Sequence, residues 1–551
     1  MTFYQITSQV KNALRRYGSE GSYESDIQVY SQAFSDKHRM LFTAGGEPRK
    51  SLDTILIFSM LNSSYCMQIE SILAKKFDRM GFKIVVLTSG RFKHLSDAIH
   101  KKIYGIKNVL YLEDFLRLRI SSEARRLIDS VRHSYDLAMI KGLRYRNVFT
   151  GLHSLATYSG INPSGRVMLD RKTARDILRI CYNSCRITEG IERVLNKEKP
   201  GKIIGLEKGI VGVCELFYES IFRGLDYIQW VSCHEPNSIM LKRYTTRNYR
   251  AHPFSVSEET WKAYKGRNDN YWDIVMGYFK RGYLEGEWFS YKKLATSKVV
   301  LNKEKMVSQL RLNSRKKTAV IFSHILNDAN FFYGEDLFEN GFSEWLVKTI
   351  EAAGRNKEVN WLLKLHPANV YRRTNSNYRG EYGELLAIKE GLGKIPDTIT
   401  VVPPDIDINP YSFFQSVDYG ITVRGTIGAE LPCFGIPVLT AGTGRYSGRG
   451  FTIDSLSRDE YLDKVSNIHL ISRLSAQQQD LALKHAYLFF KERPAKYDTV
   501  IRDIYPYPVG HPVYRDIEII DRDIMHNEQL TNICNFIAHS QDEDYLATRR
   551  Y

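Results

Sequence analysis

The sequence predicts an α/β protein with two doubly wound domains, each built on a mostly parallel sheet, and a C-terminal helix that crosses back. Two separate regions alternate short apolar runs with segments of helical periodicity, which is the pattern of βαβ units. The chain has 551 residues, more than one ordinary hydrophobic core accommodates, so we expect at least two domains. Glycine, histidine or arginine follows several of the apolar runs, as at strand ends that bind a ligand.

The first region opens with an apolar strand at 53–61, a helix at 67–82 and a second strand at 83–89. Their short connections indicate a right-handed βαβ unit. Three later runs are also predicted as strands: 108–115, 202–209 and 227–236.

The second region follows a short basic segment at 311–317. A strand at 318–324, a helix at 342–356 and a strand at 359–367 repeat the same alternation. Three more strands are predicted at 398–405, 418–425 and 436–442. The domain organisation is therefore expected to be an N-terminal extension 1–50, a first Rossmann-like domain 51–257, a helical bridge 258–315, a second Rossmann-like domain 316–475, and a crossover helix with an irregular tail 476–551.

Composition is that of an ordinary globular protein, with 43% hydrophobic and 25% charged residues. No apolar run approaches the roughly 18 to 20 residues that cross a bilayer, and the N-terminus lacks the pattern of a secretory signal, so we expect a cytoplasmic protein. Seven scattered cysteines argue against a disulfide framework. Cys181 and Cys185 are four residues apart without a second metal-spaced pair, which favours buried thiols over a metal site.

The formal net charge is +16, which suits an anionic partner. No nucleic-acid module is recognisable, so nucleic acid is the weakest candidate. The positive charge looks scattered along the chain. Peripheral contact with an anionic membrane is a further expectation, because basic residues near such a surface contribute about 1 kcal/mol each.

The strand at 359–367 ends in Lys364, His366 and Pro367. Proline restricts the residue before it to extended conformations, which places His366 at the strand end. Lys364 and His366 are two apart and share a face of the strand, where a cation and an imidazole suit a phosphate. The alternative is a structural histidine at a turn.

The segment 421–444 breaks at Arg424 and Gly425 and restarts as a helix through Thr426 and Ile427. Thr426 is a plausible N-cap, and unpaired amides with partial positive charge at a helix start attract phosphate. Arg424 can add bidentate hydrogen bonds, and Gly425 allows close backbone approach. Glu430 lies one turn after Thr426, where a carboxylate can accept hydrogen bonds from both hydroxyls of a ribose.

The next strand ends in Thr440, Gly442, Thr443 and Gly444, which repeats the pattern of glycine with hydroxyl groups. We predict that these residues also contact the nucleotide. The acidic stretch 405–409 lies in the second domain and is interpreted as a loop, so neither a metal nor another cofactor is expected. The negative charge of the leaving group would then be stabilised by lysine, histidine and arginine side chains and by backbone amides.

Catalytic candidates follow strands in both domains. Glu207 follows the strand at 202–209, where it can act as a general base on an acceptor hydroxyl or as a nucleophile. An exposed loop ion pair with Lys208 is the alternative. His324 and Asp328 follow the first strand of the second domain and are expected to reach toward the donor. His234 and Glu235 are weaker candidates.

Residues 318–454, with the motifs just described, resemble the capsule polysaccharide biosynthesis proteins. That family is similar to the cytidine-nucleotide-dependent bacterial Kdo transferases and sialyltransferases of GT-B fold, in which two Rossmann-like domains face each other across a cleft. The resemblance implies that Glu207 of "EKG" is the catalytic carboxylate and that His366 and Pro367 contact the nucleotide. It also implies that "RGTIGAE" holds the phosphate and ribose. "EKG" departs from the doubly acidic form of the motif by placing Lys208 second.

The resemblance predicts a metal-independent glycosyltransferase of bacterial capsule or lipopolysaccharide assembly. Its donor would be a nucleotide sugar, with CMP-linked Kdo or another acidic sugar favoured, and its acceptor a glycan or glycolipid. Three alternatives remain at this point: a CDP-polyol phosphotransferase, a UDP-sugar 2-epimerase of the same fold, and a non-catalytic subunit of polysaccharide assembly.

Overall fold

The computed structural model describes residues 20–38, 40–43, 53–134, 136–287, 298–370, 380–506 and 511–551. The predicted N-terminal extension lies outside the described residues except for α2 (Glu20–His38) and α3 (Met40–Thr43). Part of the predicted bridge, 288–297, also lies outside them. The domain boundaries themselves stay predictions.

The first sheet has seven strands in the order β12-β6-β5-β4-β1-β2-β3. The run from β5 through β4, β1 and β2 to β3 is parallel, whereas β6 and β12 are added antiparallel. At its centre Ile57 lies between Val86 and Ile204. The strand bounds are β1 Thr54–Ser59, β2 Lys83–Thr88, β3 Val109–Tyr111, β4 Lys202–Gly205, β5 Asp226–Ser232, β6 Ser238–Tyr244 and β12 Pro494–Lys496.

The second sheet has five parallel strands in the order β11-β10-β7-β8-β9. Numbered from its own first strand, this is the doubly wound order 3-2-1-4-5, and the parallel strands of the first sheet follow the same order. After two strands have been added on one side of the first strand, the next two are added on its other side. This reversal of the winding lies between β1 and β4 in one sheet and between β7 and β10 in the other. The bounds are β7 Thr318–Phe322, β8 Asn360–Lys364, β9 Ile399–Val402, β10 Tyr419–Thr422 and β11 Val438–Thr440.

Both sheets are buried by helices on their faces, as parallel sheets require. In the first unit, α4 begins where the Ser63 hydroxyl accepts a hydrogen bond from the amide of Cys66. Its buried residues join a core with β1, β2 and the C-terminal helix. The helices of the first unit are α4 Ser64–Arg79, α5 Lys93–Ser96, α6 Ser122–Asp129, α7 Leu137–Lys141, α8 Thr150–Ser159, α9 Arg171–Glu198 and α10 Cys214–Phe222.

The second unit buries its sheet with helices that include the predicted one at 342–356, here α14. A separate aromatic core lies where α12 of the bridge packs against this unit, with Phe279 stacked on Phe434 at 6.0 Å between ring centroids. The bounds are α11 Glu258–Lys265, α12 Trp272–Tyr283, α13 Lys303–Gln309, α14 Gly341–Arg355, α16 Gly383–Leu392, α17 Tyr411–Ser416, α18 Ile427–Glu430 and α19 Arg458–Ser466.

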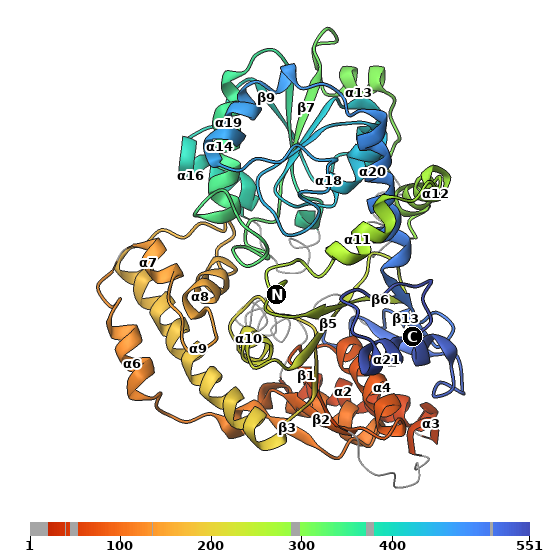
Figure 1. Ribbon diagram of the computed structural model, residues 1–551. Helices are drawn as coiled ribbons and strands as arrows, with labels where there is room; N and C mark the ends of the chain where they lie inside the picture. Colours follow the sequence, from red (N-terminus) through yellow and green to blue (C-terminus); the bar gives the residue numbers. More distant parts are fainter. Residues whose placement is uncertain are drawn as a thin grey trace.

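The crossover helix is α20 (Ala476–Tyr487), which continues through 488–492 and delivers the chain to β12 at the edge of the first sheet. Figure 1 shows the two sheets in separate halves of the molecule, with α20 running along one side. The α/β prediction with two doubly wound sheets is therefore confirmed by the strand orders.

The prediction of an irregular tail is wrong. After β12 the chain forms a hairpin of β13 (Ile501–Ile504) and β14 (Asp516–Ile519), followed by α21 (Glu528–His539). Phe536 and Ile537 of α21 are fully buried in the core of the first unit. Near the C-terminus the Asp544 carboxylate is buried between Arg493 at 3.0 Å and Lys242 at 3.1 Å.

All seven cysteines are buried free thiols, and Cys181 and Cys185 lie in α9, as predicted. Among the described residues, no helix combines the length and the apolar composition needed to span a bilayer.

Candidate functional site

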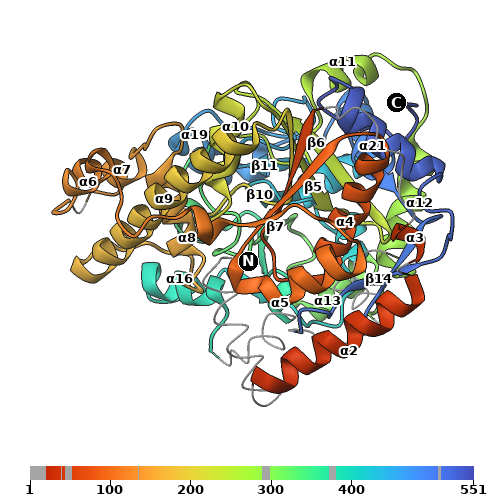
Figure 2. The same cartoon turned by 90° about the horizontal axis from the view of Figure 1, so that it is seen from below.

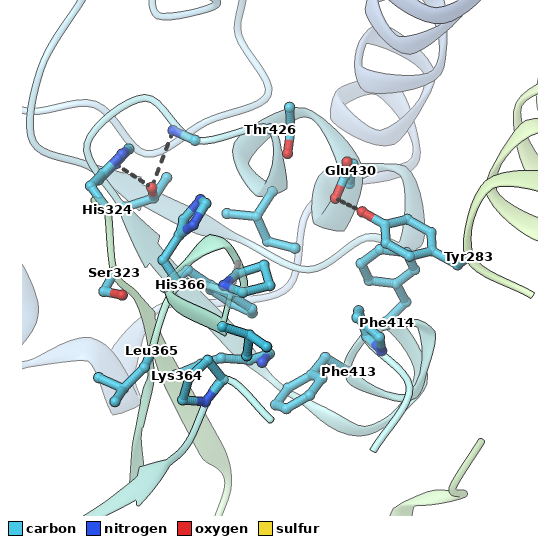
Figure 3. A pocket seen from close by; sticks show the side chains of 18 of the residues that line it. Tyr283, Ser323, His324, Lys364, Leu365, His366, Phe413, Phe414, Thr426 and Glu430 are labelled. Carbon is cyan, nitrogen blue, oxygen red and sulfur yellow. Dashed lines mark hydrogen bonds between the residues drawn. The ribbon is translucent and has the colours of Figure 1, made fainter. Parts of the chain in front are cut away.

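A cavity of about 320 Å³ lies at the carboxyl ends of β7, β8, β9 and β10, where the second sheet reverses its winding direction. This is where open α/β sheets bind ligands. Figure 3 shows labelled side chains that follow β7, β8 and β10, together with Tyr283, Phe413 and Phe414, around one space. The lining residues are Tyr283, Lys298, Phe322, Ser323, His324, Lys364, Leu365, His366, Pro367, Val370, Pro404, Asp405, Pro410, Phe413, Phe414, Thr422, Gly425, Thr426, Ile427 and Glu430.

Lys364 ends β8 and is buried, with its ammonium 5.5 Å from the centroid of the Phe413 ring. Burial, together with the nearby charge of Lys298, lowers the pKa of Lys364 to about 8. Within the described part of the chain no carboxylate forms an ion pair with Lys364. Lys364 and Lys298 both line the cavity, as do the carboxylates of Asp405 and Glu430. Lys364, a buried cation without an ion pair among the described residues, suits an anionic ligand.

His366 and Pro367 lie on the cavity wall directly after β8. The bend that places them is held by Glu384 of α16, a buried carboxylate. Its Oε1 accepts hydrogen bonds from the His366 amide at 3.1 Å and from the Ser323 hydroxyl at 2.9 Å. Burial raises the pKa of Glu384. Glu384 thus connects the end of β7 with the end of β8 through these two hydrogen bonds.

Glu430 lies in α18 and is only 1% exposed, yet it lines the cavity. Its Oε2 accepts a hydrogen bond of 2.9 Å from the hydroxyl of Tyr283, whereas its Oε1 has no hydrogen-bond partner among the described residues. A buried carboxylate oxygen without a donor is costly, so it marks a place where a ligand hydroxyl can bind. Thr426 and Ile427 line the same wall.

Thr426 does not cap α18, contrary to the prediction. Its backbone is already helical and its side chain accepts no capping hydrogen bond, and α18 is only four residues long. The hydroxyl of Thr422 accepts the Gly425 amide instead, at 3.2 Å. The predicted N-cap is therefore not formed, whereas Gly425 and Thr426 both line the cavity, and their predicted contact with a phosphate stays a prediction.

His324 organises this turn. Its Nε2 accepts hydrogen bonds from the amides of Val423 at 3.2 Å and Arg424 at 3.4 Å, and its ring stacks on Phe342 at 4.5 Å. Burial, with smaller contributions from nearby positive charges, puts the pKa of His324 well below its usual value. A neutral ring whose Nε2 accepts must carry its proton on Nδ1. This geometry favours a positioning role over the predicted catalytic one.

Arg424 is not part of the cavity lining. Its guanidinium forms an ion pair with Asp336, and its Nε donates to the carbonyl of Thr443 at 3.2 Å. Both groups are almost fully buried, so Arg424 joins the turn after β10 to the loop before α14. The prediction that Arg424 faces the phosphate is not met by its position.

Four further predicted nucleotide contacts also lie away from the cavity: Thr440, Gly442, Thr443 and Gly444. Thr440 donates to Asp454 at 2.6 Å, and the Thr443 hydroxyl accepts the amide of Glu335 at 2.8 Å. A Cβ on Gly444 would lie 2.7 Å from Gly334. The glycines after β11 therefore allow two loops to pack closely, which explains the pattern without a ligand.

Glu207 follows β4, at the point where the first sheet reverses its winding direction. Its carboxylate is half-buried, and its only hydrogen bond among the described residues comes from the amide of Lys208 at 3.3 Å. Burial raises the pKa of Glu207, and the negative charge of Asp328 from the other unit adds to the shift. The charge of Asp328, on the loop after β7, thus acts on a carboxylate of the first unit.

The loop from β7 to α14, residues 323–340, brings the two units together. It begins at Ser323 and His324 in the cavity, and its middle reaches the first unit. The ring of Phe332 packs on Gly209, so closely that a Cβ there would lie 1.9 Å from it. The Gly334 amide donates to the carbonyl of Arg250 at 2.7 Å. One loop therefore connects the cavity with the segment that carries Glu207.

Lys208 is buried and does not form the loop ion pair considered as the alternative. Its ammonium donates to the carbonyls of Tyr249 and, at 2.9 Å, Ala251, and lies 4.0 Å from the centroid of the Tyr244 ring. The second residue of "EKG" thus anchors a neighbouring loop. His234 and Glu235 lie elsewhere, beside Phe490 and Lys496, and do not line the cavity.

Several lining residues were missed by the sequence analysis: Tyr283, Lys298, Phe413, Phe414 and Asp405. Tyr283 comes from the bridge, so no strand-end rule could select it. Phe413 and Phe414 form an adjacent aromatic pair in α17 after Pro410, which is a detectable signal. Asp405 does lie in a loop, as predicted, but that loop follows β9 and reaches the cavity. In the described part of the chain no group of three or more metal-binding side chains is clustered.

No protein-family model matches the chain, and no curated protein matches its sequence. Solved structures similar to it include two Kdo transferases of Thermosulfurimonas dismutans KpsC. The β-Kdo 2,4 transferase is 14% identical with a TM-score of 0.32 over 60% of this chain and 88% of its own. The β-Kdo 2,7 transferase is 14% identical with a TM-score of 0.31 over 63% and 89%.

Another similar structure is a UDP-GlcNAc 2-epimerase from Neisseria meningitidis, 10% identical with a TM-score of 0.21 over 79% of this chain and 99% of that one. Kdo transferases, which the sequence resemblance named, are thus among the solved structures similar to this chain. Such distant similarity does not decide what the chain does, so its own geometry must.

Proposed function

We propose that the chain is a glycosyltransferase that binds a nucleotide-sugar donor in the cavity of the second unit and an acceptor beside Glu207 of the first. One observation carries the proposal. The two sheets share one winding order, the cavity lies at the reversal point of one, and a carboxylate lies at the reversal point of the other. A single loop joins the two places.

The cavity offers the groups that a nucleotide needs. Oε1 of Glu430 has no donor within the described part of the chain and can accept a hydrogen bond from a ribose hydroxyl. Phe413 and Phe414 supply apolar surface. Lys364, Lys298 and His366 supply positive charge or hydrogen bonds for a phosphate. The volume of about 320 Å³ lies at the lower end of the range of small-molecule sites.

The proposed chemistry is glycosyl transfer with Glu207 as general base. The carboxylate takes the proton of an acceptor hydroxyl, whose oxygen forms a bond to the anomeric carbon of the donor. The bond from that carbon to the nucleotide phosphate breaks, and the nucleotide leaves with the electron pair. Partial burial suits Glu207 to this role, because a raised pKa makes a carboxylate a stronger base. Lys364 and Lys298 stabilise the negative charge of the leaving nucleotide.

The donor is proposed to be CMP-linked, with Kdo or another acidic sugar, and the acceptor a glycan or glycolipid of bacterial capsule or lipopolysaccharide. These finer assignments rest on the sequence resemblance of 318–454. Localisation at the inner face of the plasma membrane is part of the same proposal. Transfer of a neutral sugar from a UDP donor would keep the geometry and change only the occupant of the cavity.

Isothermal titration calorimetry with CMP, CDP and UDP tests the donor site. Glu430→Gln and His366→Ala should each weaken binding about tenfold or more, since each removes a hydrogen-bonding group from the cavity. Lys305→Gln, on an exposed face of α13, is the matched control and should leave binding unchanged. If none of the three nucleotides binds, or if both cavity variants bind as the wild type does, the proposal fails.

Mass spectrometry of the product then identifies the reaction. A mass gain equal to one sugar residue on the acceptor supports glycosyl transfer. A gain that includes a phosphate would indicate polyol-phosphate transfer, and conversion of a UDP-sugar without any acceptor would indicate epimerisation. Loss of polymer in cells that carry Glu207→Gln separates an enzyme from a non-catalytic subunit.

A further inference from the structure

The positive charge is spread over more than one part of the chain: residues 242–317 contain 18 Lys and Arg against seven Asp and Glu, and residues 117–186 form a second basic segment. Residues 117–186 contain 14 Lys and Arg against five Asp and Glu, an excess of nine out of +16 for all 551 residues. Twelve of the 14 are arginine, whose guanidinium pairs with phosphate in two parallel hydrogen bonds. We refer to residues 117–186 as the basic arm.

The basic arm is a small helical layer beside the first sheet. It comprises α6, α7, α8 and the first half of α9, which pack together around Ile140, Leu155 and Ile177. In Figures 1 and 2 the helices α6 and α7 lie at the outer edge of the molecule, far from the C-terminus and α21. The arm is thus an extension of the first unit that presents much of its surface outward.

Most cations of the arm point into solvent without a carboxylate. In the described part of the chain, Arg146 forms an ion pair with Glu192, and Arg179 lies 3.9 Å from the carboxylate of Asp176. Arg171, Arg175 and Arg179 follow one another at four-residue spacing on α9 and form one exposed stripe. The exposed cations of the arm are Arg117, Arg119, Arg125, Arg126, Arg132, Arg144, Arg146, Arg171, Lys172, Arg175 and Arg179.

Apolar side chains are exposed among these cations. Leu118 is 92% exposed between Arg117 and Arg119. Met168 is 61% exposed just before the arginine stripe, and Met139 of α7 is 52% exposed. Arginine with exposed leucine and methionine is the composition of surfaces that lie in the headgroup region of a bilayer. A hydrophilic polyanion such as an acidic glycan would use the cations but not the apolar side chains.

We propose that the basic arm docks the chain on the surface of an anionic phospholipid bilayer. The arginines contact lipid phosphates, and Leu118, Met139 and Met168 enter the headgroup region. The arm shares its core with Phe331, Phe332 and Tyr333 of the loop between β7 and α14. Docking would therefore hold the bilayer beside the unit that carries Glu207, where a lipid-linked acceptor could reach it. The docking itself does not depend on the proposed transferase activity.

Vesicle co-sedimentation of the full chain tests the surface. The vesicles contain phosphatidylcholine alone or with an equal amount of phosphatidylglycerol, at low and at high salt. The triple variant Arg125→Gln, Arg171→Gln, Arg175→Gln should bind the anionic vesicles about a hundredfold more weakly, at about fivefold per basic residue. The control triple Lys305→Gln, Arg315→Gln, Lys357→Gln removes equal charge from exposed positions outside the arm and should bind within about threefold of the wild type.

Leu118→Ser tests the apolar contact, with Leu456→Ser as its control because Leu456 is 94% exposed elsewhere. Leu118→Ser should weaken binding about fivefold at both salt concentrations, since apolar burial is not screened by salt. The docking proposal is overturned if the wild type ignores anionic vesicles, if both triples weaken binding equally, or if the chain binds heparin but not vesicles. Nucleotide titration of each variant keeps this outcome separate from failure of the proposed function.

Discussion

The hydroxyl of Tyr283 donates a 2.9 Å hydrogen bond to Oε2 of Glu430, whereas Oε1 of the same carboxylate has no donor among the residues that the structure describes. Tyr283 ends α12 of the bridge, whereas Glu430 ends α18 of the second unit. A segment outside the strand-end pattern thus fixes the orientation of the carboxylate that is proposed to bind the ribose.

Tyr283→Phe should therefore weaken nucleotide binding about tenfold, because the carboxylate loses the donor that orients it. The loss should be confined to ligands with ribose hydroxyls. Calorimetry with CMP and with its 2′,3′-dideoxy analogue measures the difference. Tyr411→Phe, a nearby buried tyrosine of α17 outside the cavity lining, is the control. An equal effect of Tyr283→Phe on both ligands would contradict the role of the hydrogen bond.

Gly209→Ala should loosen the contact between the two units. The new Cβ would lie 1.9 Å from the Phe332 ring, and overpacking of this kind costs about 1–3 kcal/mol. Thermal unfolding should show the loss, and Phe332→Leu in the same chain should restore part of it. Gly266→Ala, where a Cβ meets nothing within 4 Å, should leave the unfolding temperature unchanged. Additive effects of the two substitutions at 209 and 332 would mean that the contact does not form.

Replacing Lys364 by an apolar residue should have opposite effects on the stability of the fold and on nucleotide binding. Its pKa is lowered from 10.5 to about 8, so the folded state disfavours the charged form. This cost to stability is fully present below about pH 8 and disappears as the pH rises toward 10.5. Lys364→Met should therefore raise the free energy of unfolding by about 1–3 kcal/mol at pH 7, with no gain near pH 11.

The same substitution should weaken nucleotide binding at pH 7, since a cation is lost from the cavity. In the wild type, an anionic ligand should raise the pKa of Lys364 and cause proton uptake near pH 8. Calorimetry in two buffers of different ionisation enthalpy detects that uptake. Lys305→Met, an exposed lysine, should change neither stability nor uptake. A Lys364→Met variant that still takes up a proton would exclude Lys364 as its source.

The strands and one wall of the cavity could be predicted from sequence because both follow from local patterns. Apolar runs fixed the parallel strands, and the rule for strand ends selected Lys364, His366 and Glu430. Residues whose role depends on a distant segment were missed. Tyr283 reaches Glu430 from 147 positions away, and Glu384 holds His366 from a helix.

The same limit explains the residues that were assigned wrongly. Arg424 and Gly442 to Gly444 have the composition of a phosphate loop, but their neighbours are Asp336, Glu335 and Gly334 of the loop before α14. Sequence alone could not show that a buried carboxylate was already paired with the arginine. The strand β12 and the helix α21 were missed because their partners, β6 and α4, lie hundreds of residues earlier.

The last prediction concerns Glu207 of the first unit, whose pKa is raised by burial and by the charge of Asp328 of the second unit. If Glu207 is the general base, Glu207→Gln should abolish transfer and leave nucleotide affinity within about twofold, since Glu207 does not line the cavity. In the wild type, kcat/KM should rise with pH through a pKa above the usual glutamate value, because burial and the charge of Asp328 disfavour ionisation of Glu207. Asp328→Asn removes that charge and should move the rising limb to lower pH.

Asp328→Glu is the matched control, because it keeps the charge and should keep the position of the limb. The pH profile separates this electrostatic effect from direct chemistry by Asp328. If Asp328→Asn abolishes turnover at every pH, Asp328 acts on the substrate itself, as the sequence analysis predicted. If the rising limb of the pH profile moves while the maximal kcat/KM is unchanged, Asp328 acts only by raising the pKa of Glu207. An unshifted limb in both variants would mean that the two carboxylates do not meet in the working protein, and the proposed acceptor site would then lie elsewhere.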